Sequence, residues 1–317
     1  MGPSVLRLWG RAVIKKKPDQ TQATKQQLKL YENASLIANE NAKTAKEMKF
    51  MARAMVMATM PHLDPGDVQS WGRRNGDFSL IIQPGIIIDK DTGETKSLGV
   101  PYGVIPRLLL CWATTEAVKT KSRKIVLGNS LTDFMRKLDM EPTGGRLGTI
   151  GRFKNQVIRL FSSTVSCVYT GKDGFDRKAL SIADEQHLWW NPQSPDQVAL
   201  WESHVVLGER FFNEVVSSPV PIDFRALKAL KKSPLCLDIY MWLTYRFSYL
   251  GKPTVIPWNA LMEQFGSNYK RTVDFHVNFD KCLKKVLVVY RDANVSQNKN
   301  GLLLKPSKTS ISLNTGL

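Results

Sequence analysis

An internal repeat constrains this chain more than any other feature of its sequence. When the sequence is shifted by 130 residues without a gap, residues 112–135 fall on residues 242–265. Four positions are then identical, pairing Trp112 with Trp242, Thr114 with Thr244, Asn129 with Asn259 and Leu131 with Leu261. Both segments also share the order of their expected elements, which is an apolar helix, a basic connector, a short strand and a short helix. The chain is therefore expected to contain two copies of one folding unit.

The segments that follow each repeat extend the pattern. The first copy continues with a glycine-rich turn, a helix over residues 149–161 and a β-like run over residues 165–171. The second copy continues with a turn at Gly266, a helix over residues 271–287 and a hairpin over residues 288–305. Helix, strand, short helix, turn, long helix and hairpin is the order of a winged helix-turn-helix. The sequence thus predicts an α+β protein with two tandem winged-helix domains.

Composition sets the limits of these domains. Residues 1–45 are polar and rich in Lys, Gln and Asn, which is typical of a flexible basic arm with at most a weak helix. A Pro-rich break separates the first winged-helix domain, expected over residues 46–218, from the second, expected over residues 219–312. Residues 313–317 are expected to form a tail.

Local signals place further elements. Met and Ala favour a helix over residues 46–61, whereas residues 78–83 and 86–100 are strand-like. The short helix of each copy is expected to begin at a polar cap, which is Asn129 (or Ser130) in the first copy and Asn259 in the second.

The charge balance indicates an anionic partner. The 317 residues include 45 Lys and Arg against 28 Asp and Glu, a net charge of +17. Such an excess most often serves nucleic-acid binding, and an anionic membrane surface is the competing interpretation. No apolar run approaches the roughly 18 residues that cross a bilayer, so no membrane-spanning segment is expected, and DNA rather than a membrane is the expected partner. The basic excess is concentrated at the two ends, with +6 over residues 1–50 and +8 over residues 205–317.

The cysteines and histidines indicate no metal chemistry. The chain has four of each, without a Cys-x-x-Cys, His-x-His or His-x-x-x-His pair. Scattered cysteines in apolar runs are typical of core thiols in a reducing cytoplasm. We therefore expect no catalytic residue, no metal and no cofactor.

The helix expected over residues 271–287 has one apolar stripe, formed by Phe275, Phe279, Cys282 and Val286 and widened by Leu283. Beside the stripe lies a basic and polar flank that suits a DNA major groove, because Arg pairs with guanine, Asn with adenine and Lys with phosphate. Val277, on the opposite side, could meet a thymine methyl if it is exposed. A solvated charged face is the alternative. The candidate DNA-binding residues of this domain are Lys270, Arg271, Asn278, Lys281, Lys284, Lys285, Arg291, Lys299 and Lys305.

The glycine-rich segment before the helix at 149–161 raises the question of a phosphate loop. Gly151 is followed by Arg152 rather than by Lys-Ser or Lys-Thr, and the glycine spacing does not fit a dinucleotide fingerprint. The glycines are expected to set the helix angle, with phosphate contact by backbone amides as a further possibility. The inward residues are expected to be Ile150, Phe153, Val157 and Leu160. The candidate DNA-binding residues are Arg146, Arg152, Asn155 and Arg159.

Residues 141–161 and 219–250 resemble the RepA-type plasmid replication initiator family, close to the broad-host-range initiators of IncW-like plasmids. The resemblance implies a bacterial, plasmid-encoded, cytoplasmic protein that binds double-stranded origin DNA at repeated sequences (iterons) and opens the adjacent duplex. It also implies recruitment of the host replicative helicase and host initiator, a monomer–dimer equilibrium, and autoregulation. On this basis the first domain is assigned to dimerisation and auxiliary DNA contact, and the second to iteron binding. The family often has an aromatic residue where this chain has Leu147.

Two other functions remain open at this stage. A winged-helix transcriptional repressor would present the same DNA-binding surface. A rolling-circle nickase would need a tyrosine nucleophile beside a metal held by closely spaced histidines, which the scattered histidines do not favour.

Overall fold

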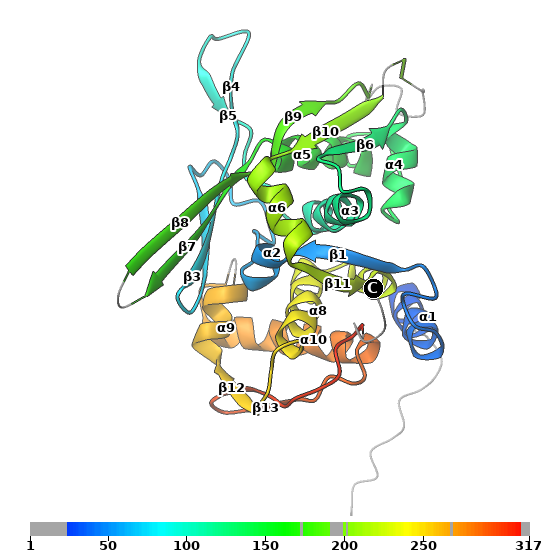
Figure 1. Ribbon diagram of the computed structural model, residues 1–317, viewed down its shortest axis with the longest axis vertical. Helices are drawn as coiled ribbons and strands as arrows, with labels where there is room; N and C mark the ends of the chain where they lie inside the picture. The colour runs from blue at the N-terminus through cyan, green and yellow to red at the C-terminus, as the bar shows by residue number, and fades with distance from the viewer. Residues whose placement is uncertain (1–23, 172–173, 191–198, 201, 267–268, 312–317) are drawn as a thin grey trace, which may run out of the picture.

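The two halves of the chain repeat one series of helices and strands (Figure 1). A computed structural model describes residues 24–171, 174–190, 199–200, 202–266 and 269–311. The first series is β1 (Met48–Ala52), α2 (Arg53–Met57), α3 (Val104–Thr120), β6 (Lys124–Gly128), α4 (Leu131–Lys137) and α5 (Thr149–Phe161). The second series is β11 (Pro219–Asp223), α7 (Phe224–Leu230), α8 (Pro234–Phe247), β12 (Thr254–Pro257), α9 (Trp258–Phe265) and α10 (Thr272–Val289).

The shift of 130 residues matches the start of corresponding elements. Helix α3 begins at Val104 and α8 at Pro234, while β6 begins at Lys124 and β12 at Thr254. The expected repeat is confirmed in these elements, and the register is lost at the next helix, since α4 begins at Leu131 and α9 at Trp258. Ser130 caps α4 by accepting a hydrogen bond from Asp133 N. The expectation for Asn259 is wrong. Helix α9 begins at Trp258 with Pro257 as its N-cap, so Asn259 lies inside the helix.

Additional strands distinguish the first half from the second. The chain between α2 and α3 holds β2 (Trp71–Asn75), β3 (Phe78–Gln83), β4 (Ile86–Ile88) and β5 (Thr95–Ser97). The chain after α5 holds β7 (Thr164–Gly171), β8 (Gly174–Ser181), β9 (Ala183–His187), β10 (Ser203–Leu207) and α6 (Glu209–Ser217). Strands β2, β3, β7 and β8 form one antiparallel sheet, β6 joins β10 and β9 in another, and β4 pairs with β5 in a hairpin that projects from the body (Figure 1).

The second half ends in a small sheet. Strand β13 (Val295–Asn298) pairs with β14 (Gly301–Leu304), and β14 pairs on its other side with β12. The expected hairpin is present, but its first strand begins later than predicted. Residues 288 and 289 still belong to α10, and Val289 is buried on that helix.

Two expectations for the N-terminal region need correction. Residues 48–52 form a strand rather than part of a helix, because β1 pairs with β11 across the middle of the molecule. The arm expected over residues 1–45 contains α1 (Lys25–Asn39), which has a capping box at Thr24 and Gln27 and buries Leu30 and Ala34. Helix α1 lies against α7 and α10, so it belongs to the packed body. Residues 1–23 and 312–317 lie outside the described residues.

The expected core stripes are buried. The four inward residues of α5 and the five of α10 are all buried, as their helical spacing predicted. The buried apolar side chains of both halves form one continuous core. The halves therefore pack directly on each other.

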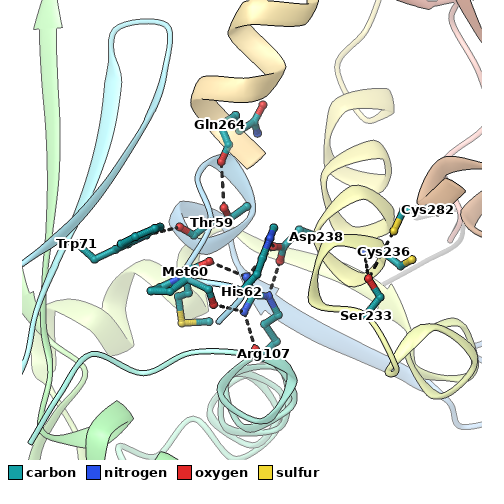
Figure 2. A network of polar contacts seen from close by, with 12 residues as sticks. Thr59, Met60, His62, Trp71, Arg107, Ser233, Cys236, Asp238, Gln264 and Cys282 are labelled. Carbon is teal, nitrogen blue, oxygen red and sulfur yellow. Dashed lines mark hydrogen bonds and ion pairs between the residues drawn. The ribbon is translucent and has the colours of Figure 1, made fainter. Parts of the chain in front are cut away.

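A buried ionic cluster lies where α3 meets α8 (Figure 2). The guanidinium of Arg107 donates two hydrogen bonds to Asp238, from Nε at 2.6 Å and from Nη2 at 2.7 Å. His62 Nε2 lies 2.9 Å from Asp238 Oδ2. The side chains of Arg107 and Asp238 are only 2% and 3% exposed. Burial alone would raise the pKa of Asp238, but the charge of Arg107 and the hydrogen bonds from His62 and Arg107 outweigh it, so this pKa lies below its ordinary value.

The same arginine fixes the segment that follows α2. Its remaining donors reach the carbonyl oxygens of Met60 at 2.8 Å, Pro61 at 3.3 Å and Gly103 at 2.5 Å. On the other side of this segment, the Thr59 hydroxyl donates to the carbonyl of Gln264 in α9 at 3.0 Å (Figure 2). Residues 59–62 are thus held by both halves of the chain.

We expect Arg107→Met to lower the free energy of unfolding by about 3–5 kcal/mol, because Asp238 would remain as a buried charge without its main partner. The double variant Arg107→Met/Asp238→Leu should lose less than this, because it removes both charges together. Urea unfolding followed by circular dichroism measures both changes.

Lys96→Met serves as the matched control. Lys96 pairs with Asp89 at 3.2 Å on the surface, so its loss should change stability by less than about 1 kcal/mol. Equal losses for Lys96→Met and Arg107→Met would show that the buried cluster does not stabilise the contact between the halves.

Candidate nucleic-acid interface

Helix α10 presents a row of exposed side chains opposite its buried stripe. Phe275 and Phe279 face the core, whereas Val273, Val277 and Lys281 follow one another at four-residue spacing on the outer side. Lys284 continues this side. Val273 is 70% exposed and Val277 is 47% exposed. The outer side of α10 therefore combines two apolar groups with two lysines.

The β13–β14 hairpin is fixed against α10. His276 Nε2 lies 3.2 Å from Gln297 Oε1, which accepts in this contact, and Gln297 Nε2 donates a hydrogen bond to Asp280 Oδ1 at 2.7 Å. The indole of Trp258 donates to the Asn298 carbonyl at 3.1 Å. The ring centroids of Trp258 and His276 lie 3.9 Å apart. These contacts fix the hairpin that carries Lys299 against α10.

Several candidate cations of this region are exposed. Arg271 makes two hydrogen bonds of 2.8 Å to Asp274, and Lys284 pairs with Asp280 at 2.7 Å. Both pairs are on the surface, where they contribute little to stability and can exchange for another anion. The exposed candidates are Lys270, Arg271, Lys281, Lys284, Lys285, Arg291, Lys299 and Lys305.

Asn278 lies away from the exposed row. Its amide donates to the carbonyl of Asp274 at 2.9 Å, within the same helix. Asn278 also lines a cavity of about 370 Å³ at the start of α8, together with His62, Tyr269 and Cys282. The helix therefore turns this side chain toward α8, and its expected contact with a base edge finds no support in this geometry.

The first copy brings three of its four candidates to the surface. Arg146 lies in the turn before α5, and Arg152 and Asn155 lie on the helix, all exposed. Arg159 differs, because its side chain is 17% exposed and Nη1 lies 3.4 Å from Asp64 Oδ1 and 3.3 Å from the Val100 carbonyl. Its guanidinium also lies over the ring of Tyr102. Arg159 holds the segment before α3 against α5 and is not part of an outward strip.

The glycine-rich turn is closed by two threonines. Thr149 N donates to the Thr143 hydroxyl at 3.0 Å, Thr143 N donates to the Thr149 hydroxyl at 2.9 Å, and Ile150 N donates to the Thr143 carbonyl at 3.3 Å. The amides of Thr149 and Ile150 are thus occupied by the turn itself, which argues against phosphate contact by these two groups. Gly145 has a φ of +80°, and a Cβ on Gly148 would lie 2.2 Å from the Thr143 oxygen. The glycines therefore serve the tight closure of the turn.

A family model described as plasmid-encoded RepA protein matches residues 100–259, which is half of the chain. This chain belongs to the plasmid-encoded RepA family. The matched residues of this RepA protein run from the start of α3 to the start of α9, so α10 and its hairpin lie beyond them. Family membership places the chain among plasmid replication proteins and confirms the resemblance found in its sequence.

Two solved structures are similar to this RepA protein at low sequence identity. A crystal structure of selenomethionine derivatives of domains 2 and 3 of RctB shares 12% identity, with a TM-score of 0.48 over 80% of this chain and 95% of that one. A second structure, of RctB domains 2–3, shares 11% identity, with a TM-score of 0.45 over 80% and 96%. TM-scores below 0.5 are too low to transfer any property from these chains. No curated protein matches the sequence.

Some features of the candidate interface were not foreseen from the sequence. Val273 was overlooked, although it precedes Val277 by four residues and shares its side of the helix. The anchoring of the hairpin by Trp258, His276 and Gln297 has no sequence signal, because it joins three separate elements. In the part of the chain that the structure describes, no three His, Cys, Asp or Glu side chains gather where they could hold a metal, and no helix could span a membrane.

We expect Gly148→Ala and Gly151→Ala to change stability in opposite directions. Gly148→Ala should cost about 1–3 kcal/mol, because the new methyl would strike backbone atoms of the turn. Gly151 lies in the first turn of α5 with open space around it, so Gly151→Ala should stabilise by about 0.5–1 kcal/mol. Thermal unfolding of both variants measures the difference, and a harmless Gly148→Ala would mean that the turn does not require this closure.

Proposed function

We propose that this RepA protein initiates plasmid replication by binding repeated sequences (iterons) in the duplex DNA of the plasmid origin. The observation that carries the proposal is the outer side of α10, which exposes Lys281 and Lys284 on a helix that also holds the hairpin of Lys299 through Gln297 and Asp280. Nine basic residues stand against three acidic ones over residues 266–317. A rigid helix with such a surface suits entry into a major groove, with the lysines directed to phosphates.

The order of elements supports a winged-helix interpretation of each half. In the second half, α8, β12, α9, α10 and the β13–β14 hairpin follow one another in the winged-helix order, with α10 in the position of the recognition helix. In the first half, α3, β6, α4 and α5 follow one another in the same order, and the antiparallel strand β10 pairs with β6 and β9 as β14 pairs with β12 and β13. We propose two tandem winged-helix domains on this basis, the second providing the main DNA contact.

Helix α5 supplies an auxiliary contact in this proposal. Arg146, Arg152 and Asn155 are exposed at its start and along one side, whereas Arg159 is left out because it is held against Asp64. The residues around α5 carry a smaller basic excess than the C-terminal region, which agrees with a secondary role.

The other parts of the proposal rest on family membership alone. They are duplex opening, recruitment of the host replicative helicase and host initiator, a monomer–dimer equilibrium in which the first half dimerises, and repression of the protein's own gene. All of them place the protein in the bacterial cytoplasm, and none requires a catalytic residue, a metal or a cofactor.

The DNA contact is tested by its salt dependence. The probe is a duplex that the protein itself selects from a pool with a randomised centre of about two helical turns. Lys281→Ala should reduce the slope of log K against log salt by about 0.9, which corresponds to one phosphate contact. Fluorescence anisotropy at a series of salt concentrations measures this slope.

Lys90→Ala provides the matched control. Lys90 is also exposed and lies in the connection between β4 and β5, a hairpin that Figure 1 shows far from α10. Its replacement should leave the slope unchanged. If Lys281→Ala and Lys90→Ala behave alike, α10 is not the DNA-binding helix.

An initiator and a simple repressor differ in what they allow a plasmid to do. A circular DNA that carries this gene, its flanking DNA and a resistance marker, and no other replication origin, should replicate in a bacterial host. The same circle with Lys281→Ala and Lys284→Ala should yield far fewer transformants. A circle that fails with the wild-type gene, while the protein still binds the flanking DNA, would identify a repressor.

A further inference from the structure

Two valines form an apolar spot in the middle of the basic surface of α10. Val273 and Val277 are among the most exposed apolar side chains of the C-terminal half. They are separated by four residues, so their Cα atoms lie about 6 Å apart along the helix axis. Exposed valines on an otherwise polar helix side indicate a partner with apolar groups of its own.

The charges around the valines restrict what this partner is. Lys270 and Arg271 precede Val273 at the helix start, Lys281 follows Val277 by one turn, and Lys299 lies on the neighbouring hairpin. A partner must therefore carry negative charge around a small apolar centre. The floor of a DNA major groove fits this description, because the 5-methyl groups of thymine project there between two rows of phosphates.

We propose that Val273 and Val277 pack against the 5-methyl groups of two thymines in the major groove. Consecutive base pairs are about 3.4 Å apart, so the 6 Å separation of the two side chains corresponds to thymines about two base-pair steps apart. The inference rests on the proposed DNA contact by α10 and adds the bases that the helix reads. The lysines bind the backbone in any sequence, whereas the two valines give a preference for T·A pairs.

The inference extends to the role of Asn278. Because the Asn278 amide is engaged with Asp274 and faces the cavity beside α8, it is turned away from the groove. On this inference, the preference for T·A pairs comes from two side chains that form no hydrogen bonds.

The test replaces thymine with uracil, which lacks only the 5-methyl group. The probe is the duplex that the protein selects from the randomised pool, resynthesised with deoxyuridine in place of one thymidine at a time. Two positions should each weaken binding about fourfold, which is the effect of about 0.8 kcal/mol for one buried methyl group. Replacement of other thymines should have no effect.

Protein variants assign the two positions. Val273→Ala should bind thymine and uracil equally at one of them, and Val277→Ala should do so at the other. Both variants should keep the salt slope of the wild-type protein, because they remove no charge. Circular dichroism confirms that the helix is intact, and Ala has a higher helix propensity than Val.

The outcomes separate this inference from the DNA contact on which it rests. If Lys281→Ala lowers the salt slope but every uracil is tolerated, DNA binding by α10 stands and the thymine contact is wrong. A selected duplex without a pair of T·A positions at this spacing would overturn the inference as well. If the uracil effect persists in both valine variants, other residues contact the methyl groups. If no duplex is selected and the lysines do not affect binding, the proposed DNA contact fails together with the inference.

Discussion

The salt bridge between Arg107 and Asp238 is the contact on which the arrangement of the two halves depends. It joins α3 and α8 near their N-terminal ends, and these are equivalent helices of the two copies. The positions are nearly equivalent too, since residue 107 shifted by 130 falls on residue 237, next to Asp238. Equivalent strands also meet, because β1 and β11 pair antiparallel. Antiparallel pairing of equivalent strands is the arrangement that a two-fold axis between them produces.

The two copies are related by a local two-fold axis but are not identical, so their surfaces differ. The second copy is short, and its hairpin is fixed directly to α10 by Gln297 and Trp258. The first copy carries additional strands, and one of its arginines, Arg159, is engaged with Asp64 rather than with solvent. The basic surface of the second copy is therefore the more complete of the two. In the proposed function this difference makes α10 the principal contact and α5 the auxiliary one.

The parts of the fold that were predictable from the sequence depend on neighbours along the chain. Helix α5 has the predicted limits, and the stripes that contain Phe153 and Phe279 are buried, because a helical period needs only local sequence. The strand β1 was missed because its residues favour a helix, and only pairing with β11 holds them extended. A single missed strand therefore does not weaken the repeat, which was visible from the order of elements alone.

The candidate site was predictable to the same degree. Lysines on an amphipathic helix turned out to be exposed, since the buried stripe fixes which side faces outward. Asn278 and Arg159 were misplaced because each is controlled by a distant segment, the start of α8 in one case and residues 64–100 in the other. The spacing of residues on a helix shows which side of the helix each residue lies on. The spacing does not show which distant segment of the chain packs against that side chain.

The pairing of β1 with β11 has a consequence for how the protein is made. Met48 pairs with Asp223, which lies 175 residues later in the chain. During synthesis the N-terminal strand emerges from the ribosome long before its partner exists, and an unpaired edge of this kind is prone to wrong contacts. The contact between the two halves can close only when translation has passed β11. Closure of this contact is a late, non-local step that slows folding.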